Sequence, residues 1–237
     1  MASDKRSIDT GRIIERVTLI ALPILMFLCV YYEVEQTALL TLLAAILANI
    51  PFFINFEKSR PKPRHILPIV VMSALATGGR ILFTPIPHVK PVSAIVIVTG
   101  IAFGRRSGYL TGALTALASN MFMGQGPWTP WQMFAWGLIG YLSGVMESRD
   151  LFRNRWVVYG YGFVSGLLFG LIMDSWHIIS FVSPLTWKGA LTAYGSGFFF
   201  NLAHSFATVI FLVPILGSWT RKLTRIKHKF GLDYSGE

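Results

Sequence analysis

Charged side chains are scarce in this sequence. Asp, Glu, Lys and Arg make up 14% of its 237 residues, and its mean hydropathy is +0.56, whereas soluble domains carry roughly 25% charged residues. Long apolar runs recur from one end of the chain to the other. They predict an all-α, polytopic membrane protein, because lipid offers no partner for an unpaired backbone amide. The runs are continuously apolar and lack the alternating polarity of membrane β-strands.

The sequence also lacks the residue patterns of several chemistries. A single cysteine, Cys29, excludes an internal disulfide, and we expect it to be a small side chain within an apolar run. There is no G-x-x-x-x-G-K-[ST] loop for ATP, and no C-x-x-C, H-E-x-x-H or G-x-S-x-G pattern. We therefore expect no ATPase activity, no bound metal and no intrinsic cofactor. No secretory cleavage pattern follows the first apolar run, which favours a retained helix.

Eight apolar segments are predicted to cross the membrane. The fourth is shorter than the roughly 20 residues needed, so we expect it to be tilted, broken or buried among its neighbours. A basic, proline-stiffened linker at 57–64 divides the chain into residues 1–64, a core at 65–217 and a basic tail at 218–237. The predicted segments are Ile13 to Tyr32, Thr37 to Phe56, His65 to Phe83, Val92 to Phe103, Ser107 to Met123, Gln132 to Met146, Trp156 to Ile179 and Gly189 to Leu216.

The net charge of +10 comes from basic residues in the connections between these segments, which argues against nucleic-acid binding. With the N-terminus inside, 18 of the 21 Lys and Arg residues fall on one side of the membrane. Only Arg80, Lys90 and Lys188 fall on the other. Positive charge collects on the cytoplasmic side of membrane proteins, so both termini are predicted to be cytoplasmic.

Polar groups near the outer ends of the segments are the candidate ligand-binding residues. Arg80 is a functional-site candidate because an intramembrane charge is costly, although it would also serve as an anchor to head groups. Asp174 and His177 share a helix face and are expected to pair with each other and with Arg80, for a ligand or as an internal bridge between helices. Asn201 is a ligand contact or an interhelical hydrogen-bonding group.

The loop at 124–131 is rich in glycine, proline and tryptophan, which is unusual for a simple connection. Its two tryptophans predict a rigid platform for a flat or bulky ligand, with an interfacial aromatic belt as the alternative. The complete predicted ligand-binding set is Arg80, Lys90, Asn120, Gln125, Trp128, Trp131, Asp174, His177, Tyr194 and Asn201.

Small residues recur at intervals of four on two segments, at Ala74 and Gly78 and at Gly108, Gly112 and Ala116. Such spacing allows helices to approach closely. It predicts either a face that docks a partner membrane protein or packing within the bundle.

Three stretches together resemble the S-components of energy-coupling factor (ECF) transporters. The run Ile95–Gly112, with Phe-Gly-Arg-Arg-Ser-Gly-Tyr-Leu-Thr-Gly, resembles the turn between their second and third helices. Ala74 and Gly78 resemble the motif by which S-components dock, with Gly78 in place of an alanine. The loop at 124–131, followed by Gln-Met-Phe-Ala-Trp-Gly, is similar to the cobalamin-specific branch.

The resemblance implies a six-helix core preceded by two extra helices, in the plasma membrane of a prokaryote. It implies that the chain binds a vitamin at the outer face, with cobalamin as the expected ligand. Release would follow when the chain topples on a transmembrane coupling subunit that carries two cytoplasmic ATPases. Another organic cofactor as ligand, a membrane enzyme that uses Asp174, His177 and His204, and a scaffold without a ligand are the alternatives.

Overall fold

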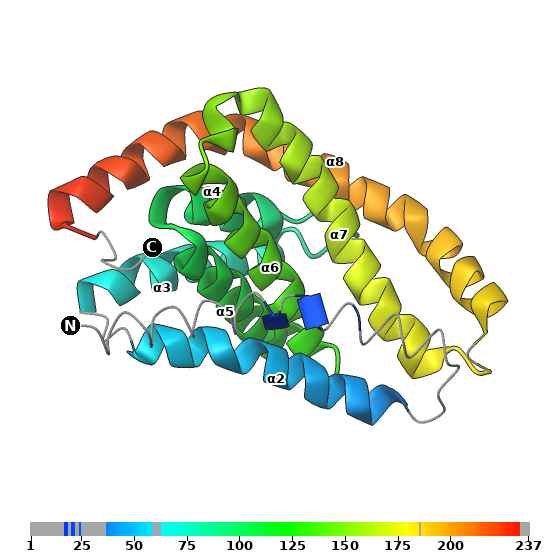
Figure 1. The fold of residues 1–237 in the computed structure, drawn as a ribbon. Helices are drawn as coiled ribbons and strands as arrows, with labels where there is room; N and C mark the ends of the chain where they lie inside the picture. Colours follow the sequence, from blue (N-terminus) through cyan, green and yellow to red (C-terminus); the bar gives the residue numbers. More distant parts are fainter. Residues whose placement is uncertain are drawn as a thin grey trace.

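The protein is described by a computed structural model in which residues 17, 18, 20, 21, 24, 37–58, 63–184 and 186–232 are placed. The described part is a bundle of helices, as predicted (Figure 1). The predicted first segment, Ile13 to Tyr32, lies almost wholly outside the described residues. The helices are α2 (Thr37–Lys58), α3 (Pro63–Leu82), α4 (Val92–Phe103), α5 (Arg105–Met123), α6 (Thr129–Ser148), the short 3₁₀ turn η1 (Leu151–Arg153), α7 (Arg155–Phe181) and α8 (Trp187–Phe230).

Three of the described helices, α3, α7 and α8, are long and apolar enough to cross a membrane by length and composition. The prediction of a polytopic helical membrane protein is therefore confirmed. The short α4 is buried on all sides, and of its twelve residues only Ile101 is partly exposed. It lies at the centre of the bundle between α3, α5, α6 and α8, which explains why it needs no polar face.

The helices α4, α5 and α6 pack at backbone distance. A single residue, Gly104, joins α4 to α5, and its φ of 89° is a conformation that residues with a side chain rarely adopt. A methyl group at Gly108 of α5 would lie 2.3 Å from the carbonyl oxygen of Gly140 on α6, and one at Gly112 would lie 2.4 Å from the carbonyl oxygen of Trp136. The small residues are thus required by close contact between these helices.

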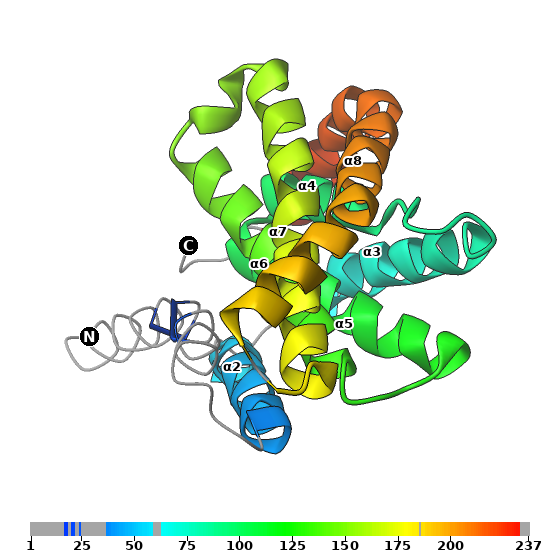
Figure 2. The ribbon, with the colours of Figure 1, turned by 90° about the vertical axis from the view of Figure 1, so that its right-hand side faces the viewer.

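The helix α2 runs along the side of the bundle opposite α8 (Figures 1 and 2) and packs mainly against α5 and α6. Phe52 stacks on Tyr109 with ring centroids 3.6 Å apart, and the Tyr109 hydroxyl donates to Asn49 Oδ1 at 2.9 Å. Asn49 in turn donates to the carbonyl oxygen of Pro130 at 3.1 Å. The additional N-terminal helix is therefore an integral part of the packed core.

Side-chain caps define the beginnings of the last two helices. Asn154 accepts a hydrogen bond from the Trp156 amide at 3.0 Å, and Thr186 accepts one from the Gly189 amide at 3.2 Å. The helix α8 has 44 residues and ends at Phe230, before Gly231, whose φ is 56°. The basic residues after Leu216, where the predicted membrane segment ends, continue the same helix. Their polarity indicated the end of a membrane segment, not the end of the helix.

Candidate functional site

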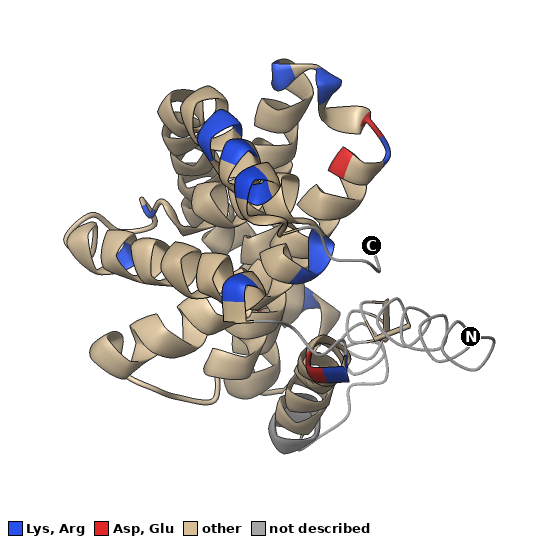
Figure 3. Ribbon diagram, turned by 90° about the vertical axis from the view of Figure 1, so that its left-hand side faces the viewer, with Lys and Arg blue, Asp and Glu red and all other residues tan. Residues whose placement is uncertain are grey.

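Most Lys and Arg residues of the described chain lie toward one end of the bundle, which faces the viewer in Figure 3. At the basic end lie the α4–α5 turn, the connection from α6 to α7 and the C-terminal part of α8. The opposite end carries the connections at 83–91, 124–128 and 182–186, and we call it the loop end. Most of the predicted ligand-binding residues lie at or near the loop end.

Arg80 is the centre of a polar network at the loop end. It lies in the last turn of α3, is 8% exposed, and donates from Nη1 to the Ser119 hydroxyl and to Asn120 Oδ1, the latter at 2.7 Å. Its Nη2 lies 3.5 Å from Gln132 Oε1, and its guanidinium lies 4.9 Å from the Trp136 ring. No carboxylate of the described residues pairs with it, so this buried cation is held by neutral groups alone.

Asn120 ties this network to α6. Its amide nitrogen donates to Thr129 Oγ1 and to Gln132 Oε1, each at 2.9 Å, and its oxygen accepts from Arg80. The side chain of Asn120 is therefore fully occupied. Gln132 is different, because within the described structure its amide N–H groups have no partner. Arg80 uses three of its five N–H donors in the network, so donors from both residues remain for a ligand.

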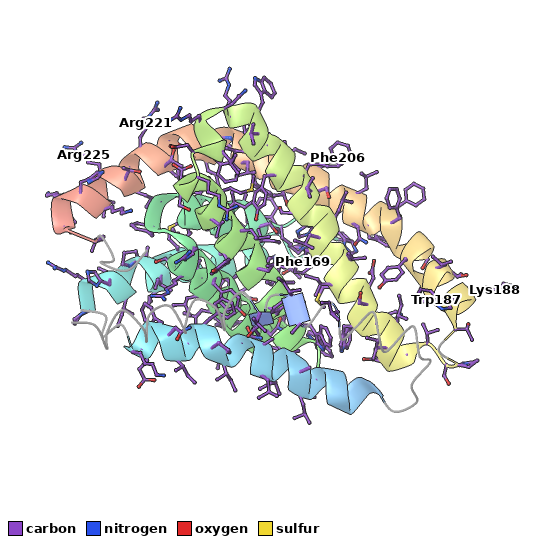
Figure 4. All side chains as sticks on the ribbon, viewed as in Figure 1. Phe169, Trp187, Lys188, Phe206, Arg221 and Arg225 are labelled. Carbon is purple, nitrogen blue, oxygen red and sulfur yellow. The ribbon has the colours of Figure 1, made fainter. Side chains whose placement is uncertain are left out.

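An aromatic stack lies beside the arginine and joins four helices. The Trp136 ring stacks on Phe169 with centroids 4.7 Å apart, and Phe169 stacks on His204 at 4.9 Å with an interplanar angle of 8°. Ser93 Oγ lies 2.9 Å from His204 Nε2 and accepts from Trp136 Nε1 at 3.3 Å. Figure 4 shows Phe169 between α6 and α7. Ser93, Trp136 and His204 are buried, so the stack forms a rigid apolar wall next to Arg80.

A second polar pair lies between α7 and α8. Asn201 donates to Asp174 Oδ2 at 2.7 Å, and Asp174 is half-buried. Each partner faces a glycine on the opposite helix. A methyl group at Gly170 would lie 2.0 Å from Asn201 Oδ1, and one at Gly197 would lie 2.6 Å from Asp174 Oδ2. The two glycines, each four residues before a polar group, make room for the pair.

The predicted group of Asp174, His177 and Arg80 does not form. Asp174 bonds to Asn201, and Arg80 bonds to α5 and α6. His177 is exposed and lies beside Phe181, with ring centroids 5.1 Å apart. A spacing of three residues places two side chains on one helix face, but it does not show which neighbouring helix each will meet. The alternative of an interhelical bond by Asn201 accounts for what is observed.

The connection from α3 to α4 lies beside the middle of α8. The Lys90 ammonium donates to the carbonyl oxygens of Phe83, Thr84 and Ile86, the last at 2.7 Å. Lys90 was predicted to bind the ligand, but these three contacts occupy its three donors and fix the loop instead. Burial and the charge of Arg80 lower the pKa of Lys90 below its usual value.

His88 attaches the same loop to α8, because its ring packs on Phe200 with centroids 4.6 Å apart. Its φ of 58° is unusual for a residue with a side chain. Partial burial and the charge of Lys90 lower the pKa of His88, against the opposing effect of Asp174. The loop therefore lies between the arginine network and the Asp174–Asn201 pair.

The loop before α6 is closed by local hydrogen bonds, but its two tryptophans do not form one platform. Trp131 is completely buried and packs with Ala45 and Ala48 of α2. It therefore offers no surface to a ligand, and its prediction as part of a platform is not supported. Trp128 is partly exposed and lies edge-to-face with Trp176, with centroids 5.9 Å apart.

Gln125 also has a local role. Its Nε2 donates to the Leu117 carbonyl at 3.0 Å, and its Oε1 accepts from the Thr129 hydroxyl at 2.9 Å. The side chain therefore closes the loop between α5 and α6. Tyr194 likewise lies within an interhelical contact, with its hydroxyl 2.6 Å from Ser175 Oγ.

The two predicted small-residue faces have different surroundings. Ala74 and Gly78 are exposed on α3, and no atom lies within 4 Å of a methyl group built at Gly78. Gly108, Gly112 and Ala116 are buried. Of the two explanations for these three residues on α5, packing within the bundle fits the structure, because α6 covers Gly108 and Gly112.

Sequence reasoning missed four residues of the site. Ser93 and Phe169 stand in apolar runs without any special pattern, and Gln132 and Trp136 were seen only as part of a resemblance. Their roles depend on which helices meet, which no spacing within one helix reveals. Among the described residues, no three His, Cys, Asp or Glu side chains come together as a metal site would require.

Comparison with known proteins identifies the class. Residues 62–221 match the family model described as ECF-type riboflavin transporter, S component, while no solved structure matches the chain significantly. The match spans more than half of the sequence, so the chain belongs to this family. It is a multi-pass membrane protein and the substrate-capture subunit of an ECF importer, which works with the coupling and ATPase modules of that transporter.

Proposed function

We propose that this subunit captures a vitamin at the loop end, which faces outward, and that both termini lie in the cytoplasm. The orientation is supported by the gathering of Lys and Arg at the other end of the bundle. The binding site is proposed to lie among α3, α6, α7 and α8, under the connection at 83–91. Arg80, Gln132 and the Asp174–Asn201 pair supply its polar groups, and the stack of Trp136 and Phe169 supplies its apolar wall.

The single observation that carries this proposal is the environment of Arg80. A buried cation without a counter-ion reduces stability unless other contacts compensate. Three neutral acceptors and one aromatic face provide part of that compensation. A ligand that presents carbonyl or other acceptor groups would use the remaining donors of Arg80 and Gln132. Such a ligand would also be oriented by the flat wall beside them.

Two vitamins fit this chemistry, each supported by one observation. Cobalamin, with amide groups around a large ring, is supported by the resemblance of the 124–137 stretch to the cobalamin-specific branch. Riboflavin, a flat ring with carbonyl groups along one edge, is supported by the description of the matching family. Burial of Trp131 removes one of the two tryptophans on which the cobalamin prediction relied.

A binding screen tests the proposal and separates the two vitamins. The purified single chain, in detergent and without ATP, is titrated with riboflavin and with cobalamin. We expect saturable binding of one of them, competed by its own analogues. Trp128→Ala reports on the loop beside the site, and Trp187→Ala serves as a control because Trp187 is an exposed tryptophan at the start of α8. If neither vitamin nor any other organic cofactor binds, the proposal is wrong.

The exposed face of α3 is proposed to dock the coupling subunit. Ala74 and Gly78 lie on this face, and close helix approach depends on small residues there. Gly78→Leu is expected to leave vitamin binding intact and to abolish ATP-driven uptake in reconstituted vesicles. Val213→Leu, at an exposed position on α8 away from this face, is the control. Normal uptake by the Gly78→Leu variant would move the docking surface to another helix.

A further inference from the structure

The C-terminal third of α8 is longer than membrane crossing requires. At about 1.5 Å per residue the 44-residue helix is ~66 Å long, while a membrane core of roughly 30 Å needs about 20 residues. Pro214 lies inside the helix, and Figure 1 shows that α8 bends and continues across the basic end of the bundle. Residues 215–230 are the part of α8 beyond this bend, which we call the C-terminal arm.

One face of the C-terminal arm packs on the bundle. Trp219 packs against the central core, and Leu223 packs both there and against a small cluster that contains Phe103 and Leu232. The backbone amide of Leu232 bonds to the carbonyl oxygen of Lys227 at 2.9 Å, which turns the chain back at the end of the helix. These contacts fix the rotation of the arm, so its other face is directed outward.

The outward face is basic. Arg221, Lys222, Arg225 and Lys229 are exposed, and Figure 4 shows Arg221 and Arg225 pointing away from the bundle. No acidic residue occurs anywhere in α8, and no carboxylate of the described chain pairs with Arg221, Lys222 or Arg225. The arm thus presents several uncompensated cations in one direction.

Two apolar side chains near the end of the arm are also exposed, on the side of the helix that carries Trp219 and Leu223. Ile226 is 42% exposed and Phe230 is 53% exposed. A basic side and a partly exposed apolar side, on a helix that continues directly from a membrane segment, are the pattern of a helix that lies at a charged membrane surface. A soluble acidic partner would match the cations, but it would give no reason for exposed apolar residues on the other side of the same helix.

We propose that the C-terminal arm binds the head groups of anionic phospholipids in the leaflet at the basic end. Arg221, Lys222 and Arg225 would contact the phosphates, and Ile226 and Phe230 would enter the boundary between head groups and acyl chains. This contact would hold the basic end at the membrane surface. It requires no vitamin and does not depend on the identity of the transported substrate.

The test uses the full chain in nanodiscs of phosphatidylcholine alone or mixed with phosphatidylglycerol. Both sides of a nanodisc carry the same lipid, so the result does not depend on orientation. A fluorescent probe is attached to Ile226→Cys in a Cys29→Ala background, and quenching by a nitroxide lipid reports lipid contact. We expect quenching in the anionic discs and much less in the neutral discs.

The triple variant Arg221→Gln, Lys222→Gln and Arg225→Gln should lower the ratio of lipid-contacting to free probe by about tenfold or more. The control variant Arg149→Gln, Arg153→Gln and Arg155→Gln also loses three cations at the basic end and should retain the contact. If the first variant does not fold, screening by added salt of the unmodified chain replaces it. Equal quenching in both lipids, or protection of the probe by an acidic protein but not by anionic lipid, would overturn the proposal.

Discussion

Replacement of Arg80 tests whether this arginine binds the ligand or only stabilises the fold. Arg80→Met removes a buried charge together with its two well-formed hydrogen bonds, to Ser119 and Asn120. Interhelical bonds in membranes contribute about 0.6–1.7 kcal/mol each, and a desolvated cation–π contact contributes about 2 kcal/mol. Several kcal/mol of desolvation penalty disappears at the same time. We therefore expect the unfolding free energy of the unliganded protein to stay within about 2 kcal/mol of the original.

Vitamin affinity should respond much more strongly. Hydrogen bonds to a charged donor contribute about 1.5–3 kcal/mol each, so loss of two donors from Arg80 should weaken binding on the order of a hundredfold or more. Arg80→Lys keeps the charge without the planar fork, and we expect it to lower both stability and affinity. Titration of the vitamin and thermal unfolding in detergent measure the two effects. A destabilised Arg80→Met variant with unchanged affinity would refute the assignment.

Three further predictions concern packing, the polar pair and pH. Gly108→Ala should destabilise the protein by about 1–3 kcal/mol through overpacking, whereas Gly78→Ala should leave its melting temperature unchanged. Asp174→Asn and Asn201→Asp should each lower the melting temperature, and the double exchange should restore it unless the two side chains act independently. The folded pKa of His88 is depressed, so protonation of its ring should weaken the packing of the 83–91 loop as the pH falls through 6.5. Faster hydrogen exchange of the loop amides should detect this weakening, and His88→Gln should abolish the pH dependence.

The helices were predictable because their signals are local. Val92–Phe103 was placed correctly from its apolar run and its flanking Pro91 and Gly104, and the turn at Gly104 followed from one glycine between two apolar segments. The continuation of α8 past Leu216 was missed, because hydropathy reports where a helix leaves the membrane and not where its hydrogen bonds end.

The arrangement of the site was less predictable, because it depends on contacts between distant segments. Arg80 and Asn120 were recognised as unusual polar residues, yet nothing in their own segments showed that they would bond to each other. Trp131 looked like a loop residue, and its burial depends on the positions of α2 and α7, which pack around it. Lys90 was predicted to contact the ligand, whereas the fold of its own loop places three carbonyl oxygens around its ammonium group.

The central claim is that this single chain captures a vitamin at the loop end through Arg80. The most direct measurement is the dissociation constant of the purified chain for riboflavin and for cobalamin, compared with that of Arg80→Met. Saturable binding of one vitamin, weakened by about a hundredfold in the variant, is the predicted result. Binding of equal strength in both proteins would contradict the claim.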